Sequence, residues 1–458
     1  MVFLNQLLGR GGMGASADFA SAQIPAIGLG AAQPSARAVD AREVRATPHL
    51  GRFLVLAAQL ALLLLIFHLY HTSDKPEFLL MVNLVFGAFL IHYWLPFRFK
   101  EPFWVAVSLG GAFLLLRPRL ALLLIAVGLA IFLILRSRVP YRFRVLALGL
   151  IFAVLIYGRA MGKLPMFFPV FGAIFMFRII IYVYDLAHSK QPAQLLPFLG
   201  YFFLLPNYFF TLFPVIDFQT MRRTYYQRDI HVIAQQGIHW MTRGTIQLML
   251  YRLVVYFNDT YLPDRVTSLG ALVSTTVLTY LLYLNVSGQF HLIVGMLHLF
   301  GYDLPETNRK YLLARGLTDF WRRINIYWKD FMVKIVYFPV YFKLRKRGDL
   351  RAQVIATAAV FFATWALHSY QSFWLRGQFI PSWPDTLFWG ILGLLVIANV
   401  LYEGRHKPQP QDSSWQGRAL RGVQVLGTFA LISNLWFLWS APSIGAWIYL
   451  MTHWMHRG

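Results

Sequence analysis

The run Phe53-Leu-Val-Leu-Ala-Ala-Gln-Leu-Ala-Leu-Leu-Leu-Leu-Ile-Phe-His-Leu-Tyr-His71 decides the class of fold, because it holds no Asp, Glu, Lys or Arg. A helix that crosses about 30 Å of hydrocarbon needs about 20 mainly apolar residues. Comparable runs recur at 77–96, 102–116, 118–136, 143–161, 165–184, 195–216, 241–257, 266–284, 286–301, 352–374, 386–403 and 420–451, the last divided near Pro442. These runs predict an all-α polytopic membrane protein with about 11–13 transmembrane or re-entrant helices.

The composition of the 458 residues supports this class. Hydrophobic residues make up 58% and charged residues 13%, whereas soluble domains carry about 25% charged residues. These values exclude a soluble multidomain enzyme, a disordered chain and collagen. The 42 Lys and Arg against 19 Asp and Glu give a net charge of +23, which in a membrane protein predicts contact with anionic lipid headgroups rather than nucleic acid. The absence of cysteine excludes disulfides, thiolate metal sites and a cysteine-linked acyl intermediate.

Basic residues gather in alternate loops between the apolar runs. They precede the first run, follow the second and follow the fourth: Arg37, Arg42, Arg45 and Arg52, then Arg98 and Lys100, then Arg136, Arg138, Arg142 and Arg144. Alternate loops lie on one side of a membrane, and Lys and Arg concentrate on the cytoplasmic side. We therefore expect a cytoplasmic N-terminus. Residues 1–50, rich in Gly, Ala and Ser, are expected to form a flexible segment ahead of the membrane helices.

Residues 303–350 do not resemble an ordinary membrane span. Aromatic and aliphatic residues recur there at spacings of three and four, with basic residues between them: Phe320, Trp321, Ile324, Tyr327, Trp328, Phe331, Ile335 and Phe338. This pattern predicts a helix that lies in the membrane interface and is capped by Thr318-Asp319. The adjacent Arg322 and Arg323 have two interpretations: they grip a phosphate of a lipid or a CoA-type donor, or they anchor the helix to headgroups.

His368 lies in Phe361-Phe-Ala-Thr-Trp-Ala-Leu-His-Ser-Tyr-Gln-Ser-Phe-Trp374, an apolar run without any charged residue. Ionisable side chains at such depth are costly and commonly mark a pathway or a reaction site. The alternative is a neutral imidazole that hydrogen-bonds to a neighbouring helix. The residues alone leave both interpretations open.

Two other histidines favour structural roles. His291 and His298 are seven residues apart, but a metal site needs three or four ligands and no acidic partner follows them on that helix face. His298 and Asp303 fit the H-x-x-x-x-D motif of glycerolipid acyltransferases. The later Gly-Glu-Gly-type motif of that family is missing, so we interpret the match as coincidental. No metal site is predicted.

The segment 283–368 resembles the membrane-bound O-acyltransferase (MBOAT) family, and most of all its bacterial branch of alginate O-acetyltransferases and teichoic-acid D-alanyl transferases. The similar stretches are Tyr283-Leu-Asn-Val-Ser-Gly288, Phe300-Gly-Tyr-Asp-Leu-Pro305, Leu317-Thr-Asp-Phe-Trp-Arg-Arg-Ile-Asn-Ile326 and Val336-Tyr-Phe-Pro339. The resemblance covers about 200–405. It implies N-terminal transmembrane helices over 51–200, a catalytic core over 201–405 around a central tunnel, and C-terminal transmembrane helices over 406–458.

The resemblance also implies a set of site residues. By order and context the catalytic histidine of the family falls on His368, and a second polar residue, which is Asn in many eukaryotic members, falls on Asn325. Residues around the matched stretches are expected to bind substrate: Trp321, Arg322, Arg323, Ser287, Gly288 and Asn285. The sequence departs from the bacterial branch at Asn285, where that branch has Asp, at 289–291, where it has Tyr-Ser-Asp, and at Ser369, where it has Gly.

The implied activity is acyl transfer, with acetyl expected, from an acyl-CoA or acyl-carrier-protein thioester to a hydroxyl of an envelope or secreted polysaccharide. The thioester is a co-substrate, and no bound cofactor is expected. Expected partners are membrane lipid, the acyl donor, a glycan or lipid acceptor and an extracytoplasmic acyltransferase, in a bacterial inner membrane. Three alternatives stay open: an MBOAT enzyme acting on a lipid or protein, a transporter or channel for an anionic substrate, and a non-catalytic scaffold.

Overall fold

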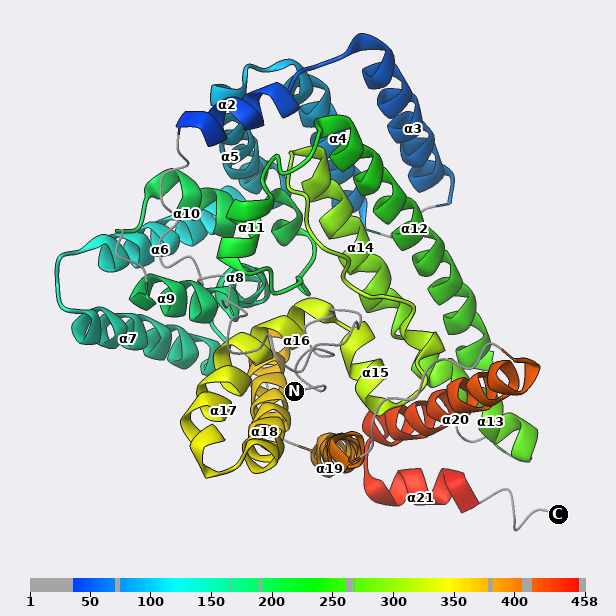
Figure 1. Ribbon diagram of the computed structural model, residues 1–458. Helices are drawn as coiled ribbons and strands as arrows, with labels where there is room; N and C mark the ends of the chain where they lie inside the picture. The colour runs from blue at the N-terminus through cyan, green and yellow to red at the C-terminus, as the bar shows by residue number, and fades with distance from the viewer. Residues whose placement is uncertain are drawn as a thin grey trace.

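A computed structural model describes residues 36–70, 75–164, 166–188, 192–260, 266, 268–377, 382–405 and 414–452 (Figure 1). This part of the chain is helical, and its only β-pairing is an isolated bridge between Tyr225 and Tyr302. Nine of the described helical stretches are long and apolar enough to cross a membrane: Leu50–Leu69, Pro76–Trp94, Pro118–Arg136, Tyr141–Ala160, Phe167–His188, Leu269–Leu299, Asp349–Arg376, Trp383–Glu403 and Trp415–Ser440. The prediction of an all-α polytopic membrane protein is confirmed.

The first five predicted runs match five helices closely: α3 (Leu50–Leu69), α4 (Pro76–Trp94), α5 (Phe97–Leu115), α6 (Pro118–Arg136) and α7 (Tyr141–Ala160). They are preceded by α2 (Ala36–Arg45), where no run was predicted. Proline begins α4 and α6 and immediately precedes α5 and α7, where its missing N–H costs no helical hydrogen bond. Residues 1–35 of the expected N-terminal segment lie outside the described residues, and α2 occupies part of the remainder.

Two predicted spans are broken into shorter helices. The run 165–184 forms α8 (Phe167–Phe175) and α9 (Arg178–His188), and the run 195–216 forms α10 (Leu195–Phe202) and the 3-10 turn η1 (Leu205–Tyr208). Pro206 and Pro214 account for the second break, because proline cannot continue a helix. The segment then leads through α11 (Phe218–Thr224) to the next long helix.

Helices α12 (Ile230–Thr260) and α14 (Leu284–Leu299) run side by side (Figure 1), with α13 (Leu269–Leu281) between them in the chain. Glycines bring their backbones together. A Cβ atom on Gly244 would lie 2.6 Å from the Gly288 carbonyl oxygen, and one on Gly237 would lie 2.7 Å from that of Gly295. Small residues allow this close approach between membrane helices.

The predicted interfacial helix over 320–338 is also divided. It forms α15 (Leu317–Arg323), α16 (Ile326–Met332), the π-helical segment η4 (Val333–Tyr337) and α17 (Phe338–Leu344). The break lies at Ile324 and Asn325, and the N-cap of α15 is Gly316 rather than the predicted Thr318-Asp319. Asp319 instead accepts a hydrogen bond from the Arg315 N–H, 3.0 Å away.

The chain ends in four helices: α18 (Asp349–Arg376), α19 (Trp383–Arg405), α20 (Trp415–Ser440) and α21 (Ile444–Thr452). The predicted division near Pro442 is confirmed by the gap between α20 and α21. Helix α18 packs against α8, η4, α17 and α19, and α19 packs against α15 and α20. These contacts place the middle of α18 among the aromatic side chains of three other helices.

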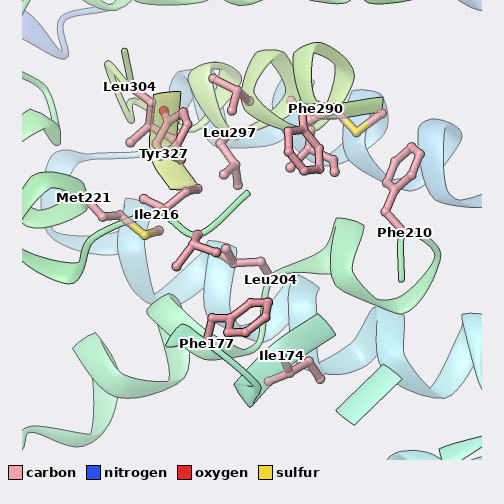
Figure 2. Close-up of a cluster of buried hydrophobic side chains, with 14 of the residues drawn as sticks. Ile174, Phe177, Leu204, Phe210, Ile216, Met221, Phe290, Leu297, Leu304 and Tyr327 are labelled. Carbon is pink, nitrogen blue, oxygen red and sulfur yellow. The ribbon is translucent and has the colours of Figure 1, made fainter. Parts of the chain in front are cut away.

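A large apolar cluster joins the two halves of the molecule. Figure 2 shows part of it, with side chains from α8 and the link to α9, the segments around α10 and α11, α14 and the loop after it, and α16. They are Ile174, Phe177, Leu204, Phe210, Ile216, Met221, Phe290, Leu297, Leu304 and Tyr327. All ten are buried. Residues from the predicted N-terminal part and from the predicted core therefore share one interior.

Candidate active site

His368 lies in the C-terminal half of α18, in a niche made of tryptophan rings. Its ring centroid is 4.8 Å from that of Trp389 on α19, 5.6 Å from Trp328 on α16 and 5.8 Å from Trp439 on α20. The His368 side chain is half-buried. The His368 ring makes no hydrogen bond to another described residue, so its ring nitrogens are available to another group.

Hydrogen bonds fix two of these tryptophans. The indole N–H of Trp439 donates to a carboxylate oxygen of Asp385, 2.6 Å away, and the indole N–H of Trp328 donates to the Thr364 hydroxyl, 3.4 Å away. Thr364 is one helical turn before His368 on α18. The niche is therefore held by bonds from α16 to α18 and from α20 to α19, in addition to ring packing.

Asn325 forms the turn that leads into Trp328. Its backbone is left-handed, with φ 39° and ψ 61°, a conformation that Asn adopts more readily than most residues. Its side-chain oxygen accepts from the Trp328 backbone N–H, 3.3 Å away, and so caps α16. Asn325 and His368 therefore both contact Trp328, Asn325 at its backbone N–H and His368 at its indole ring.

Asn308 holds this turn in place through hydrogen bonds, a role that the sequence did not predict. It is fully buried, and its side-chain oxygen accepts from the Asn325 backbone N–H at 2.8 Å and from the Tyr283 hydroxyl at 3.3 Å. Tyr283 in turn packs edge-on against the ring of Tyr311. Nothing in the sequence places Asn308 against a turn 17 residues later.

The three predicted substrate-binding residues on α15 are engaged with protein. Trp321 is buried against Phe361 of α18, with ring centroids 4.9 Å apart. Arg322 is half-buried, with its Nη2 atom 3.8 Å from a carboxylate oxygen of Glu403 on α19. Arg323 donates from Nε to Asp319, 2.7 Å away. Trp321 and Arg322 thus dock α15 onto α18 and α19, whereas the Arg323 ion pair lies within α15.

The other three predicted substrate-binding residues lie on α14. Ser287 is fully buried and lies 3.4 Å from the Tyr311 hydroxyl. Gly288 meets the backbone of α12, and Asn285 accepts from the Gln289 side chain at 2.8 Å. None of these contacts among the described residues involves His368. Ser287 connects to the Asn325 turn only through Tyr311, Tyr283 and Asn308.

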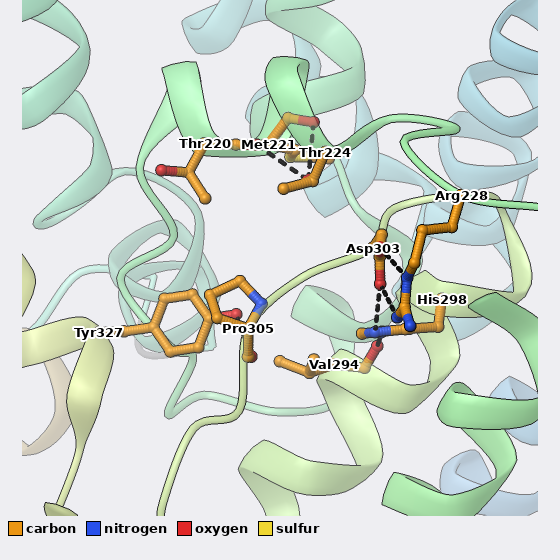
Figure 3. Close-up of polar contacts among 9 residues, drawn as sticks. All are labelled: Thr220, Met221, Thr224, Arg228, Val294, His298, Asp303, Pro305 and Tyr327. Carbon is orange, nitrogen blue, oxygen red and sulfur yellow. Dashed lines mark hydrogen bonds and ion pairs between the residues drawn. The ribbon is translucent and has the colours of Figure 1, made fainter. Parts of the chain in front are cut away.

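Another histidine, His298, lies close to Asp303 at the end of α14 (Figure 3). Asp303 forms a two-pronged ion pair with Arg228, and its other close neighbour is the Nε2 atom of His298, 3.9 Å away. His298 is fully buried and its Nδ1 bonds the Val294 carbonyl, 2.7 Å away. Because Arg228 occupies the carboxylate, this arrangement fits a structural tie between the loop at 225–228 and the loop at 300–304.

A charge cluster lies where the π-helical η4 meets α9 and α11. The ammonium of Lys334 is 2.6 Å from Asp185 and 2.8 Å from Asp217, and Asp217 also caps α11. Burial acts against the charged ammonium, but the two carboxylates outweigh it and raise the pKa of Lys334. No group of three or more His, Asp or Glu among the described residues has the arrangement of a metal site.

No protein-family model matches the chain, and no curated protein matches it.

Proposed function

We propose that this chain is a membrane-bound O-acyltransferase that moves an acyl group, acetyl in the first instance, from a thioester donor to a sugar hydroxyl of an envelope or secreted polysaccharide. The observation that carries the proposal is the environment of His368: a half-buried imidazole in the C-terminal half of a helix long and apolar enough to span a membrane. It is ringed by Trp328, Trp389 and Trp439 and has no hydrogen-bond partner in the described part of the chain. The resemblance of 283–368 to the MBOAT family supports the same assignment.

In the proposed reaction His368 acts as the general base. A ring nitrogen takes the proton of the acceptor hydroxyl while the hydroxyl oxygen attacks the thioester carbonyl carbon. The tetrahedral intermediate collapses, the carbon–sulfur bond breaks, and the thiolate takes the proton from the imidazolium. The ester product and a free thiol leave, and the imidazole is neutral again. General-base catalysis of this kind contributes about 10²–10⁴ in rate.

Asn325 has the second role in this proposal. Its side-chain oxygen caps α16, which leaves the amide N–H₂ as a pair of donors near the Trp328 niche. A donor directed at the developing oxyanion contributes about 10²–10³ in rate. The proposal includes three further features. They are a tunnel that would admit donor and acceptor, a place in a bacterial inner membrane with a cytoplasmic N-terminus, and an extracytoplasmic partner that completes delivery to a polysaccharide.

The test is acyl transfer by the purified full chain in nanodiscs. Labelled acetyl-CoA and longer acyl-CoAs are supplied with glycan or lipid acceptors, and both thioester loss and label in the acceptor are followed. His368→Gln is compared with His68→Gln, whose imidazole lies on α3 and bonds the Leu64 carbonyl at 2.8 Å. We expect His368→Gln to lose about 10²-fold or more in rate with an unchanged thermal unfolding temperature, and His68→Gln to stay active.

The outcomes separate the alternatives. Equal turnover by wild type and His368→Gln removes the histidine from the mechanism. Label in lipid but not in glycan keeps the chemistry and changes the acceptor. Flux of an anionic substrate across the bilayer without any thioester loss favours a transporter, and neither flux nor thioester loss favours a scaffold.

A further inference from the structure

The turn between α17 and α18 carries exposed cations that the proposed reaction does not use. The two helices pack side by side, and the 3-10 segment η5 (Arg345–Arg347) joins them (Figure 1). We name the exposed cations on η5 and next to it the basic turn: Lys343, Arg345, Lys346, Arg347 and Arg351.

The protein itself does not neutralise the basic turn. Within the described part of the chain, none of the five cations forms an ion pair with Asp or Glu. Arg345 instead lies over the ring of Phe342, 5.3 Å from its centre. Asp349 is the one carboxylate between residues 343 and 351, and it accepts hydrogen bonds from the Tyr341 hydroxyl and the Gln353 amide. The basic turn therefore keeps a positive charge that another molecule can meet.

An exposed apolar stripe on α18 leads up to the basic turn. Ile355 is 38% and Phe362 68% exposed, and Ala358 between them is exposed as well. At 3.6 residues per turn these three positions share one helix face with Arg351, and the opposite face is buried. Because α18 is long and apolar enough to cross a membrane, this stripe is the face that meets lipid chains.

The uncharged part of α18 sets the depth of the basic turn. From residue 352 to residue 375 the helix has no Asp, Glu, Lys or Arg. At 1.5 Å per residue this part is about 36 Å long, enough to cross roughly 30 Å of hydrocarbon. Arg351 is the residue just before it, so the basic turn lies at headgroup level at one end of the stripe. The exposed Phe342 and Leu350 lie beside it.

We propose that the basic turn and the apolar stripe bind an anionic phospholipid. An acyl chain lies along Ile355, Ala358 and Phe362, and the phosphate lies at Arg347 and Arg351. A planar guanidinium can donate two parallel hydrogen bonds to phosphate, which suits these two residues to the headgroup. One helical turn separates Arg351 from Ile355, so headgroup and chain contacts are adjacent on the same face.

The two parts of the surface together favour a lipid over a soluble acidic partner. An acidic peptide would meet the cations but would leave the exposed Ile355 and Phe362 without a role, because both lie at hydrocarbon depth. A zwitterionic lipid would cover the stripe but would bring its own cation toward the basic turn. An anionic phospholipid satisfies both parts, and basic clusters beside membrane helices are typical of such binding. The proposal does not depend on acyl transfer.

The test uses the absence of cysteine from the chain. Ala358→Cys places a single thiol in the exposed stripe, where a fluorophore is attached. The labelled full chain is reconstituted in phosphatidylcholine nanodiscs that contain increasing proportions of phosphatidylglycerol or phosphatidylcholine with a nitroxide on the acyl chain. Quenching by the two nitroxide lipids gives their relative association constant at the stripe.

Two triple variants in this labelled background lose the same charge. Lys346→Gln, Arg347→Gln and Arg351→Gln together neutralise most of the basic turn. Arg117→Gln, Arg119→Gln and Lys163→Gln together are the control, because these three cations are exposed at other turns and form no ion pair in the described part of the chain. All six positions are exposed, so unfolding temperatures are expected to stay unchanged.

We expect the labelled chain to favour phosphatidylglycerol by about fivefold, the factor that one cation near an anionic surface contributes. The basic-turn variant should lose this preference and the control should keep it, and high salt should weaken it. Equal quenching by the two lipids, or the same loss in both triple variants, overturns the proposal. Binding of poly-glutamate without any lipid preference also overturns it, in favour of a soluble acidic partner.

Discussion

Gly244 on α12 and Gly288 on α14 are in backbone contact: a Cβ atom on Gly288 would lie 3.0 Å from the Gly244 carbonyl oxygen, and the reverse distance would be 2.6 Å. Gly237 and Gly295 repeat the contact seven residues away along each helix. A backbone carbonyl oxygen is among the obstacles in each case, together with side-chain atoms such as Cγ of Met241 and of Leu248. The two helices therefore have no easy way to make room for a larger residue.

Gly244→Ala and Gly288→Ala are each predicted to destabilise the protein by about 1–3 kcal/mol, the usual cost of forcing extra volume into a packed interior. The measurement is thermal unfolding in one fixed detergent. Gly87→Ala on α4 is the matched control, because a Cβ atom there meets nothing within 4 Å. It is expected to be neutral or slightly stabilising, since Ala has the higher helix propensity. Equal effects at Gly87 and Gly288 would contradict the packing argument.

Asn325 allows structure and chemistry to be separated. Asn325→Ala is predicted to cost about 2–3 kcal/mol, because Ala tolerates the left-handed backbone poorly and does not cap α16. Asn325→Asp keeps the cap and the turn but loses the amide donors. In a transfer assay Asn325→Asp is therefore expected to fold normally and to lose about 10²–10³ in kcat. Full activity of the folded Asn325→Asp variant would leave Asn325 with only its capping role.

Lys334 lies between the carboxylates of Asp185 on α9 and Asp217 at the start of α11. Lys334→Met is predicted to destabilise the protein by about 3 kcal/mol, because Asp185 and Asp217 lose the ammonium that lies 2.6 Å and 2.8 Å from them. Adding Asp185→Asn to Lys334→Met removes the remaining repulsion, so this double variant should recover much of the loss. Thermal unfolding of the two single variants and the double variant measures the coupling. If the stability changes of the two single variants simply add in the double variant, the charges do not interact.

His231 predicts a pH dependence of stability. It is the second residue of α12 and is buried, with its ring 5.3 Å from that of His49 and its Nδ1 3.2 Å from the Tyr93 hydroxyl. Burial lowers the pKa of His231 below the usual 6.5, an effect that Asp229 opposes. Below that usual value the unfolded chain binds a proton that the folded chain resists, so stability is present above pH 6.5 and is lost as the pH falls through the lower, folded pKa.

The wild type is therefore expected to lose unfolding temperature between pH 7 and the acidic side of the imidazole titration, and His231→Gln is expected to lose less over the same interval. Both proteins share every other titrating group, so the difference between the two curves isolates His231. Parallel curves would show that this histidine titrates alike in the folded and unfolded chain.

The sequence predicted the fold class and most of the helices, because each signal was local. The run 118–136 has the same bounds as α6, since Pro118 and Arg136 mark its ends. The break between α8 and α9 was missed because its cause is tertiary. Nothing around Phe175 resembles a helix terminator, yet α8 ends there, and Arg178 reaches carbonyls of both α8 and α10. A guanidinium that caps a helix some 20 residues away leaves no periodic trace in sequence.

The candidate site shows the same division. His368 was identifiable as an ionisable residue in an apolar run, and Asn325 as the polar residue after two arginines. The Trp389 and Trp439 rings come from helices whose order along the chain does not predict which faces meet, so the niche itself was not predictable. Asn308 required knowledge of a turn that tertiary contacts impose.

Arg178 has a consequence for how the chain enters a bilayer. Helix α10 ends with the carbonyls of Tyr201 and Phe202, which both accept from the guanidinium at the start of α9, and the Phe202 carbonyl also accepts from the Asn207 side chain. The guanidinium alone in hydrocarbon costs about 2.5–3.5 kcal/mol on insertion scales. Neither α9 nor α10 inserts favourably into hydrocarbon by itself. Contact between them lowers the free energy of insertion of both. We therefore expect α8, α9 and α10 to leave the translocon together, as one unit of biogenesis rather than three successive ones.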